Sequence, residues 1–490
     1  MPFLQTQRDT LLKYPTWERV YIYFEHCRGP FFVFQDTSRI SSLMLESSNE
    51  CVALRYAICA LSISSSPECT AWHMANAELD EPVSSQGQFM YEAAKRAMGL
   101  HELYQSSHSP SLRVLQVTVL LGLYELRCSR FCQAWSTVSR AVWIADSLKL
   151  HFLDTSPPFS QFPDENIDDV HAALWATTAL TGFFSLSGRM IGTTAGSEIS
   201  SKMPLPTQDF HVSGFADLSP LTMAHLFSRK APRRLTVHEA MCACGVILPR
   251  IMSHIRATYE DTILPPYNFW TNHQKIHGAI GYITTLAQDA IEIEPVIDVL
   301  LNAFSIVLHD AARRRRHELT VQNFKSAWSA EERAVQHACH ISKIVQVRTL
   351  SQDCWATITG SWALYVALRS LLQRQQRIAL GETYPVAHFQ QNSDLSVYHN
   401  DFISVGDPII TPTTVGGNFE SFGDSPSLLA DALVLDSINS LRLALAERSN
   451  FCPLTTFFLS QVDVETSYLT ENMYSDILGC IDFTASSPMS

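Results

Sequence analysis

The stretch that decides the fold is SLRVLQVTVLLGLYELRCSRFCQAWSTVSRAVWIADSLKLHFLD, residues 111–154. Apolar residues recur in it every three or four positions, which is the period of a helix with one buried face. The pattern stops at 128–130 and then resumes, and this connection is so short that it predicts a tight turn between two antiparallel helices. On the second helix Trp135, Val138 and Val142 share one face, and we expect Trp135 to be buried there.

Several short groups of residues within this helix pair stand in a characteristic order and spacing. They are Gly122, Tyr124-Glu125, Ala134-Trp135, Arg140-Ala141 and Leu150-His151. They resemble the central helical pair of the fungal-specific transcription factor regulatory domain, the middle homology region of zinc binuclear-cluster regulators. This resemblance implies an all-α fold, a multi-helix superhelical bundle. Periodicity alone is typical of any buried helical hairpin, so only the resemblance points to gene regulation.

The resemblance continues on both sides of the pair. The segments 49–65 and 86–104 have helical patterns rich in small residues, and they resemble the helices that precede the central pair in this family. Downstream, the chain resembles a second signature of this family at Asp168-Asp169, Trp175, Gly188-Arg189 and Leu205-Pro206. Further helical patterns follow at 235–259, 270–292, 296–317, 328–348, 352–377 and 427–447.

The second signature departs from the family in three places. Residues 170–173 replace a run of arginines, Thr181-Gly182 replaces an Asp-Arg pair, and Met190 stands where proline is usual. These charged side chains would normally form ion pairs inside the bundle. Their loss makes this helix unusually apolar, and its packing is where we expect a difference from the family.

Charge limits what the chain can bind directly. It has 490 residues, 46% of them hydrophobic, and a formal net charge of −13, which argues against unaided binding to a nucleic-acid backbone. The acidity is concentrated from Ile378 onward, where there are fourteen Asp and Glu but only Arg442 and Arg448 as basic residues. The densest basic run, Arg313 to Arg316, is more typical of a solvated helix end than of a nuclear-import signal.

These patterns predict three parts of the chain. Residues 1–380 form the helical regulatory domain, 381–426 an acidic disordered linker, and 427–490 a C-terminal helix with an acidic tail. The acidic part is typical of a segment kept soluble by its charge. Aromatic residues among its acids leave a transactivation segment as the alternative.

The twelve cysteines are scattered, as expected of reduced core residues in an intracellular protein. A zinc binuclear cluster needs six cysteines within about 30 residues, and the sequence has no such run. The nearest approaches to ligand pairs are Cys242 with Cys244, Cys128 with Cys132, and His337 with Cys339 and His340. None has further ligands at a matching spacing, so we expect no metal and no cofactor.

The usual enzyme motifs do not occur in the sequence either. There is no glycine-rich phosphate loop, no G-x-S-x-G elbow and no H-E-x-x-H. Asp168-Asp169 lacks the third carboxylate of a magnesium-binding motif and is better suited to a helix start, where it meets the positive end of the helix dipole. We expect no catalytic residues. The alternative to a regulator is a helical enzyme or small-molecule binding protein outside the nucleus.

The resemblance implies a nuclear transcriptional regulator of a metabolic or secondary-metabolite gene cluster. It implies action through a homodimer or a DNA-binding regulator as partner, and a response to a small-molecule effector. Because this sequence has no zinc cluster, we expect it to reach DNA only indirectly, or through a zinc cluster encoded upstream of Met1. No apolar run reaches the roughly 20 residues of a membrane span, so we expect no membrane contact.

Overall fold

The computed structural model describes residues 46–63, 83–104, 110–153, 167–187, 202–203, 221–256, 268–315, 330–348, 350, 354–379, 426–449 and 452–468. Over these ranges the chain is all-α, as the sequence predicts. The extended backbone pairing found in them is a single antiparallel bridge between Lys202 and Thr222. Within the same ranges, none of the helices combines the length and the hydrophobicity that crossing a membrane requires.

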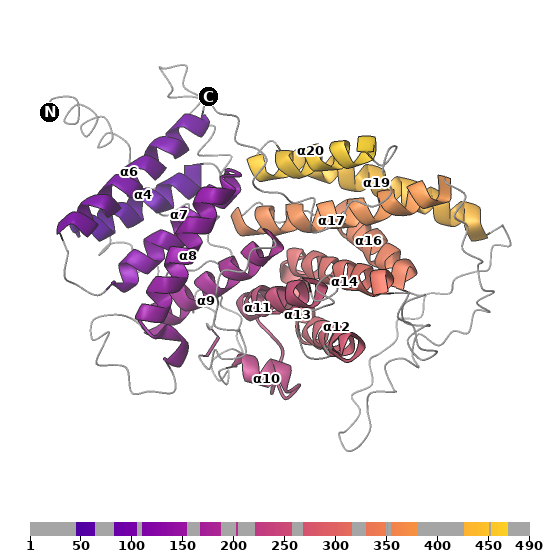
Figure 1. Cartoon of the computed structure of the whole chain (residues 1–490), viewed down its shortest axis with the longest axis horizontal. Helices are drawn as coiled ribbons and strands as arrows, with labels where there is room; N and C mark the ends of the chain where they lie inside the picture. Colours follow the sequence, from indigo (N-terminus) through magenta and orange to yellow (C-terminus); the bar gives the residue numbers. More distant parts are fainter. Residues whose placement is uncertain are drawn as a thin grey trace.

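The elements of Figure 1 are α4 (Asn49–Ile63), α6 (Val83–Tyr104), α7 (Leu112–Arg127), α8 (Phe131–Ser147), η2 (Leu150–Phe152), α9 (Ile167–Phe184), η3 (Ser185–Ser187), α10 (Met223–Phe227), α11 (Val237–Arg256), α12 (Phe269–Leu286), α13 (Gln288–Ile293), α14 (Val296–Arg314), α16 (Ala330–Val347), α17 (Cys354–Ala379), α19 (Pro426–Ser449) and α20 (Pro453–Tyr468). Three features differ from the sequence prediction, one of them being the short helix α10, which was not predicted. The helix expected at 270–292 is divided into α12 and α13 at Ala287, and α20 was not predicted.

The predicted hairpin is formed by α7 and α8, which pack against each other and against α9 (Figure 1). Backbone hydrogen bonds close the turn between them: the amide of Ser129 donates to the carbonyl of Leu126 at 3.0 Å, and the amide of Arg130 to that of Glu125 at 2.9 Å. Ser129 has a φ of 58°, the left-handed conformation in which many helices end. The three-residue connection is thus a tight turn, as predicted.

The start of α7 is tied to two other helices through Ser111. Its hydroxyl accepts a hydrogen bond from the amide of Val114 at 3.2 Å and donates one to Oε2 of Glu50 on α4 at 2.9 Å. The other oxygen of Glu50 lies 2.9 Å from Nε2 of His101 on α6. One helix cap therefore connects α4, α6 and α7.

The joint between the two halves of the molecule is the crossing of α9 and α11. α9 is buried along nearly its whole length, as its apolar sequence predicts. A Cβ atom on Gly182 would collide with the carbonyl oxygen of Gly245 on α11, and a Cβ on Gly245 would lie 2.7 Å from Cα of Ala179. Because the backbones touch here, the Asp-Arg pair of the family would have no room at Thr181-Gly182.

The second half of the chain is built around α14, which is buried over most of its length and packs against α11, α12, α16 and α17. In Figure 1, α19 and α20 lie along α17. These two helices contribute Ile438, Leu441 and Phe458 to the same hydrophobic core as the earlier helices.

The last described helix also touches the hairpin. The ring of Phe457 on α20 lies 5.1 Å from that of Phe131 at the start of α8, measured between centroids. The thiol of Cys452 lies 3.8 Å from the carbonyl oxygen of Arg127, although 325 positions separate these residues in the sequence. The turn of the hairpin is therefore covered by the start of α20.

Candidate functional site

The signature helices enclose a buried polar group, which we call the Glu125 cluster: Tyr91, Lys95, Glu125 and Arg130. The side chain of Glu125 is fully buried on α7, and its Oε1 atom accepts a hydrogen bond from the hydroxyl of Tyr91 on α6. Nζ of Lys95 lies 3.7 Å from the same oxygen and 3.1 Å from the Tyr91 hydroxyl. The guanidinium of Arg130, in the turn, lies 5.3 Å from the centre of the Tyr91 ring. One carboxylate thereby joins α6 to the hairpin.

Tyr124 extends this cluster along α7. Its ring stacks on that of Tyr91 with 5.0 Å between centroids and 21° between planes. Burial raises the pKa of both phenols well above its ordinary value, so both remain neutral hydrogen-bond donors. The signature residues Tyr124 and Glu125 are thus brought together with Tyr91, in an arrangement that holds α6 against α7.

The other small signature residues determine how closely the helices approach. A Cβ on Gly122 would lie 3.0 Å from Cγ2 of Val138 on α8 and 3.4 Å from Cδ2 of Leu180 on α9. Ala134 is fully buried on the facing side of α8. Larger side chains at Gly122 or Ala134 would push the three helices apart.

The prediction that Trp135 is buried is wrong. Its side chain is 37% exposed, and that of Trp143, two turns later, is 61% exposed. The buried face of α8 is instead made by small and branched residues, including Ala134, Val138 and Ala141. Ala134 precedes Trp135 by one position and therefore points about 100° away from it around the helix.

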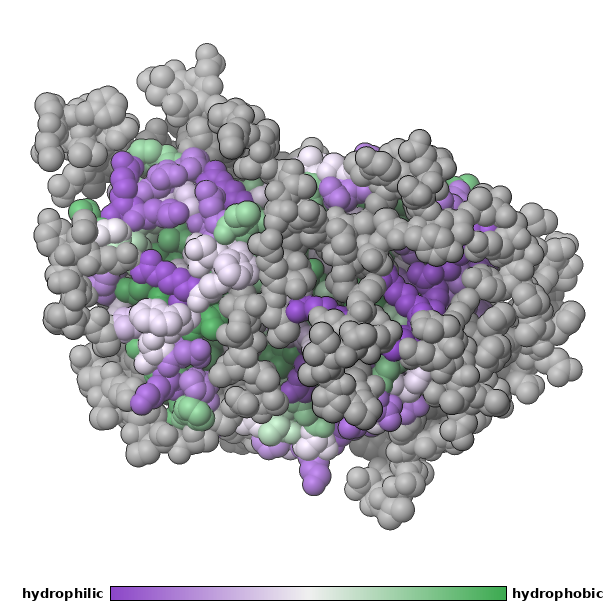
Figure 2. Space-filling view, in the orientation of Figure 1, coloured by the Kyte–Doolittle hydropathy of each residue, from purple (hydrophilic) through white to green (hydrophobic). Residues whose placement is uncertain are grey.

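The outer side of this region consequently presents exposed aromatic side chains, which we call the aromatic face: Trp135, Trp143 and Phe152, the last being 49% exposed in η2. Cys132 and Arg140 are also exposed on α8. Figure 2 shows that the described surface of this half mixes hydrophilic and hydrophobic areas. Exposed aromatic rings on a rigid helix are typical of protein-interaction surfaces.

The final signature pair, Leu150-His151, ends the hairpin. Lys149 turns the chain with a φ of 54°, and Leu150 is fully buried behind it. Nδ1 of His151 lies 3.7 Å from Oδ1 of Asp146, and its ring contacts that of Phe152 at 4.1 Å between centroids. Leu150 anchors this end of the hairpin, while His151 lies beside the aromatic face.

Several sequence predictions fall on parts of the chain that the structure does not describe. The second-signature residues Gly188, Arg189, Leu205 and Pro206 lie outside the described residues, as do Arg316 and the predicted linker 381–426 apart from Pro426, which begins α19. Asp168-Asp169 does lie in the first turn of α9, as predicted.

The basic run does end a helix, α14, but the expectation that it is solvated is wrong for Arg315. This side chain is buried, with its guanidinium 5.6 Å from the centre of the Phe269 ring. Nε of Arg313 lies 3.5 Å from Oδ1 of Asp310. Arg315 is therefore packed inside the protein, while the partly exposed Arg313 lies beside a carboxylate.

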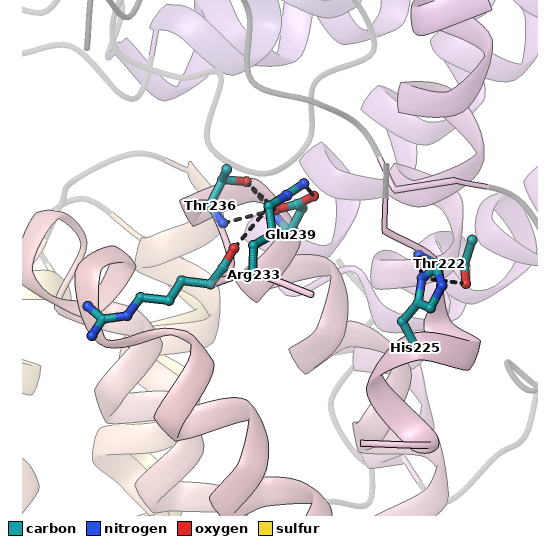
Figure 3. A network of polar contacts seen from close by, with 6 residues as sticks. Thr222, His225, Arg233, Thr236 and Glu239 are labelled. Carbon is teal, nitrogen blue, oxygen red and sulfur yellow. Dashed lines mark hydrogen bonds and ion pairs between the residues drawn. The ribbon is translucent and has the colours of Figure 1, made fainter. Parts of the chain in front are cut away.

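A second polar network, which the sequence analysis missed, fixes the start of α11 (Figure 3). The carboxylate of Glu239, fully buried, receives two hydrogen bonds from Arg233, at 2.8 and 2.6 Å. It also accepts from the amide and the hydroxyl of Thr236 at 2.9 and 3.0 Å. Thr-x-x-Glu is the sequence signature of a capping box, so the signal was present in the sequence. Thr222 and His225 cap α10 in a similar way (Figure 3).

The residues considered as metal ligands have other contacts. Nδ1 of His337 lies 2.7 Å from Oδ1 of Asn302, and Nε2 of His340 lies 3.1 Å from Oδ2 of Asp298, so both bind α14. In the described part of the chain, no three His, Cys, Asp or Glu side chains are grouped as a metal ion requires. Most of the described cysteines are buried, including both Cys242 and Cys244, as expected of core residues.

Comparison with known proteins gives one positive result. Residues 20–176 match the family model of the fungal specific transcription factor domain. The matched region includes α4, α6, the α7–α8 hairpin and the first half of α9, and therefore the Glu125 cluster and the aromatic face. None of the curated proteins and none of the solved structures is significantly similar to the chain. Over residues 20–176 the chain is therefore similar to the fungal specific transcription factor domain.

Proposed function

We propose that this chain regulates transcription of a fungal metabolic or secondary-metabolite gene cluster, in the nucleus and under the control of a small-molecule effector. The observation that carries the proposal is the match of residues 20–176 to the fungal specific transcription factor domain. The domain supports a role in transcription. The charge and the surface of the protein support a regulator that works through a partner.

Charge favours indirect contact with DNA. The net charge of −13 opposes approach to phosphates, which supply most non-specific affinity for DNA. In the densest basic run, Arg313 lies beside the carboxylate of Asp310 and Arg315 is buried over Phe269, so both guanidinium groups already have contacts within the protein. We infer that DNA is reached through a DNA-binding regulator, or through a zinc cluster encoded upstream of Met1.

The aromatic face is the surface we assign to partner contact, either in a homodimer or with a DNA-binding regulator. Trp135 and Trp143 project from a helix whose buried side, at Val138, is held tightly against Gly122 of α7. Such a fixed helix loses little freedom when its aromatic residues are buried by a partner, and tryptophan is enriched among residues that dominate binding energy.

The division into a regulatory domain (1–380), an acidic linker (381–426) and a C-terminal part (427–490) is also a proposal. In this division the C-terminal part packs against the regulatory domain, because α19 and α20 contact α17. If 381–426 is a linker, it connects two parts of one core and returns the chain to the regulatory domain.

The test uses the full chain in a fungal cell that expresses it. A tagged copy should be nuclear, and deletion should change transcript levels of a metabolic gene cluster before metabolite levels change. The double variant Trp135→Ser/Trp143→Ser should fold with an unchanged Tm but lose co-purification with its partner and mimic the deletion.

The matched control is Leu443→Ser, because Leu443 is 62% exposed on α19, away from the aromatic face. This variant should keep the partner and the transcripts. A cytosolic protein whose deletion alters metabolites first would contradict the proposal and favour a helical enzyme or small-molecule binding protein.

A further inference from the structure

The interior of the second half contains a row of histidines contributed by four different helices. We define the histidine row as His254 (α11), His273 (α12), His309 (α14) and His337 (α16), with His277 of α12 beside it. Ring centroids of successive members are 5.6, 6.3 and 5.7 Å apart, and His277 lies 5.5 Å from His309. The row crosses the layer between α11, α12, α14 and α16.

The inner members of this row are closed off from water. His254, His273 and His309 are 1%, 7% and 2% exposed. Within the described part of the chain, Nδ1 of His273 and Nε2 of His309 are buried and have no hydrogen-bond partner. A buried imidazole without partners is far easier to accommodate neutral than charged.

The charged groups that face the row oppose its protonation over most of its length. The guanidinium of Arg315, at the end of α14, faces His254, and that of Arg333 on α16 faces His273, His309 and His337. Both are positive. With burial as the larger cause, they lower the pKa of His254 and His337 to about 4 and of His273 to about 3, and they lower that of His309 as well.

Among the described residues, the carboxylate of Asp298 faces the outer end of the row, at His337. Asp298 of α14 raises the pKa of His340 through a hydrogen bond, while Lys343 of α16 opposes this. His340 is exposed and already able to carry a proton. Acid sensitivity therefore resides in the inner members, where burial and the guanidinium groups of Arg315 and Arg333 oppose protonation.

The element most dependent on the row is the first half of α12. The residues it buries there are Phe269 and His273, and both belong to the aromatic stack: Phe269 lies over His254 at 4.3 Å between centroids and 19° between planes. The second half has independent anchors in Ile280, Ile283 and a 2.9 Å backbone bond from Leu235 to Leu286. In Figure 1, α12 lies at the lower edge of the described helices, beside α14.

We propose that the histidine row is an acid-sensitive latch, which holds the first half of α12 (residues 269–278) against α11 and α14 at neutral pH and releases it on acidification. The folded row takes up protons less readily than a free imidazole, whose pKa is about 6.5. The latch is therefore fully closed above about pH 6.5 and weakens as the pH falls below it. For each histidine freed, the opening constant rises about tenfold per pH unit.

Hydrogen exchange followed by mass spectrometry, on the full chain at pH 7.5 and 5.5, tests the latch once rates are corrected for intrinsic chemistry. Peptides covering 269–278 should lose protection at pH 5.5 by about tenfold for each histidine released, while those covering α7 should keep theirs. His273→Phe, which retains an aromatic ring and cannot be protonated, should reduce this loss about tenfold. His254→Phe is a second variant with the same expectation.

The control is His101→Gln, which removes a histidine on α6, outside the row. It should leave the acid response of 269–278 unchanged. The proposal is overturned if protection of 269–278 does not change with pH, if both phenylalanine variants respond like the parent, or if all helices lose protection together. It is also overturned if Zn²⁺ or Ni²⁺ raises the Tm at pH 7.5 and His309→Phe abolishes the rise, since the row would then be a metal site.

Discussion

Gly182 of α9 and Gly245 of α11 meet backbone to backbone, so that neither position can hold a side chain without moving a helix. This contact joins the half of the molecule that contains the signature hairpin to the half built around α14. The two helices can cross this closely because each glycine has only a hydrogen atom where other residues have a side chain.

Gly182→Ala should therefore lower the free energy of unfolding by about 1–3 kcal/mol, the usual cost of overpacking a core. Gly99→Ala on α6 is the matched control, because a Cβ there would meet nothing within 4 Å. It should be neutral or stabilising by up to about 1 kcal/mol, since alanine favours a helix. Urea unfolding of both variants decides the matter, and equal stabilities would show that the crossing is not tight.

Tyr91→Phe should destabilise the protein by about 1–3 kcal/mol, because it leaves the buried carboxylate of Glu125 without its phenol donor. The same change made in a Glu125→Leu background should cost much less, since the group that needs the donor is gone. A double-mutant cycle measured by denaturant unfolding gives this coupling. A coupling near zero would mean that the two side chains do not depend on each other.

Truncating two tryptophans of the same region should cost very different amounts of stability. Trp175→Ala should cost about 3–5 kcal/mol, because Trp175 is 1% exposed and its Nε1 donates to the carbonyl of Lys202 at 2.7 Å. Trp135→Ala should cost less than about 1 kcal/mol, as for other surface positions. Thermal unfolding of the two variants separates them, and a large loss at Trp135 would restore the view that it is buried.

The two ion pairs at the start of α11 should contribute differently to stability, because one is buried and the other is exposed. Glu239→Ala should destabilise by about 3–5 kcal/mol, because it removes the helix cap and leaves Arg233, whose side chain is 13% exposed, without its carboxylate. Arg234→Ala breaks a pair with Asp289 in which both side chains are at least 60% exposed, and should cost no more than about 1 kcal/mol. Comparable losses in chemical denaturation would contradict this ranking.

The sequence was informative wherever one segment alone determines the structure. The helical period and the short connection at 128–130 predicted α7, α8 and their turn, because both are local properties. Trp135 was misplaced because the pattern gives weight to large apolar residues, whereas the buried face of α8 is centred on Ala134, Ala141 and their neighbours. Small residues fill an interface where helices approach closely, and they leave little trace in hydrophobic periodicity.

Other features could be recognised only in the tertiary structure. The break at Ala287 carries no proline or glycine to mark it. The histidine row combines residues from four helices, and in the sequence only its member His337 had been considered, together with His340, as a weak metal hypothesis. Burial of Arg315 likewise depends on Phe269, which belongs to another helix. These relationships arise between elements, so no single stretch could predict them.

The contact of α20 with the hairpin has a practical consequence for dissecting this protein. A fragment trimmed to the family match, residues 20–176, would uncover Phe131 by losing Phe457, and would expose the side of α7 on which Cys452 lies. It would also cut α9 before the glycine crossing. Such a fragment would be prone to aggregate, and a failure of it to bind a partner would say nothing about the intact protein.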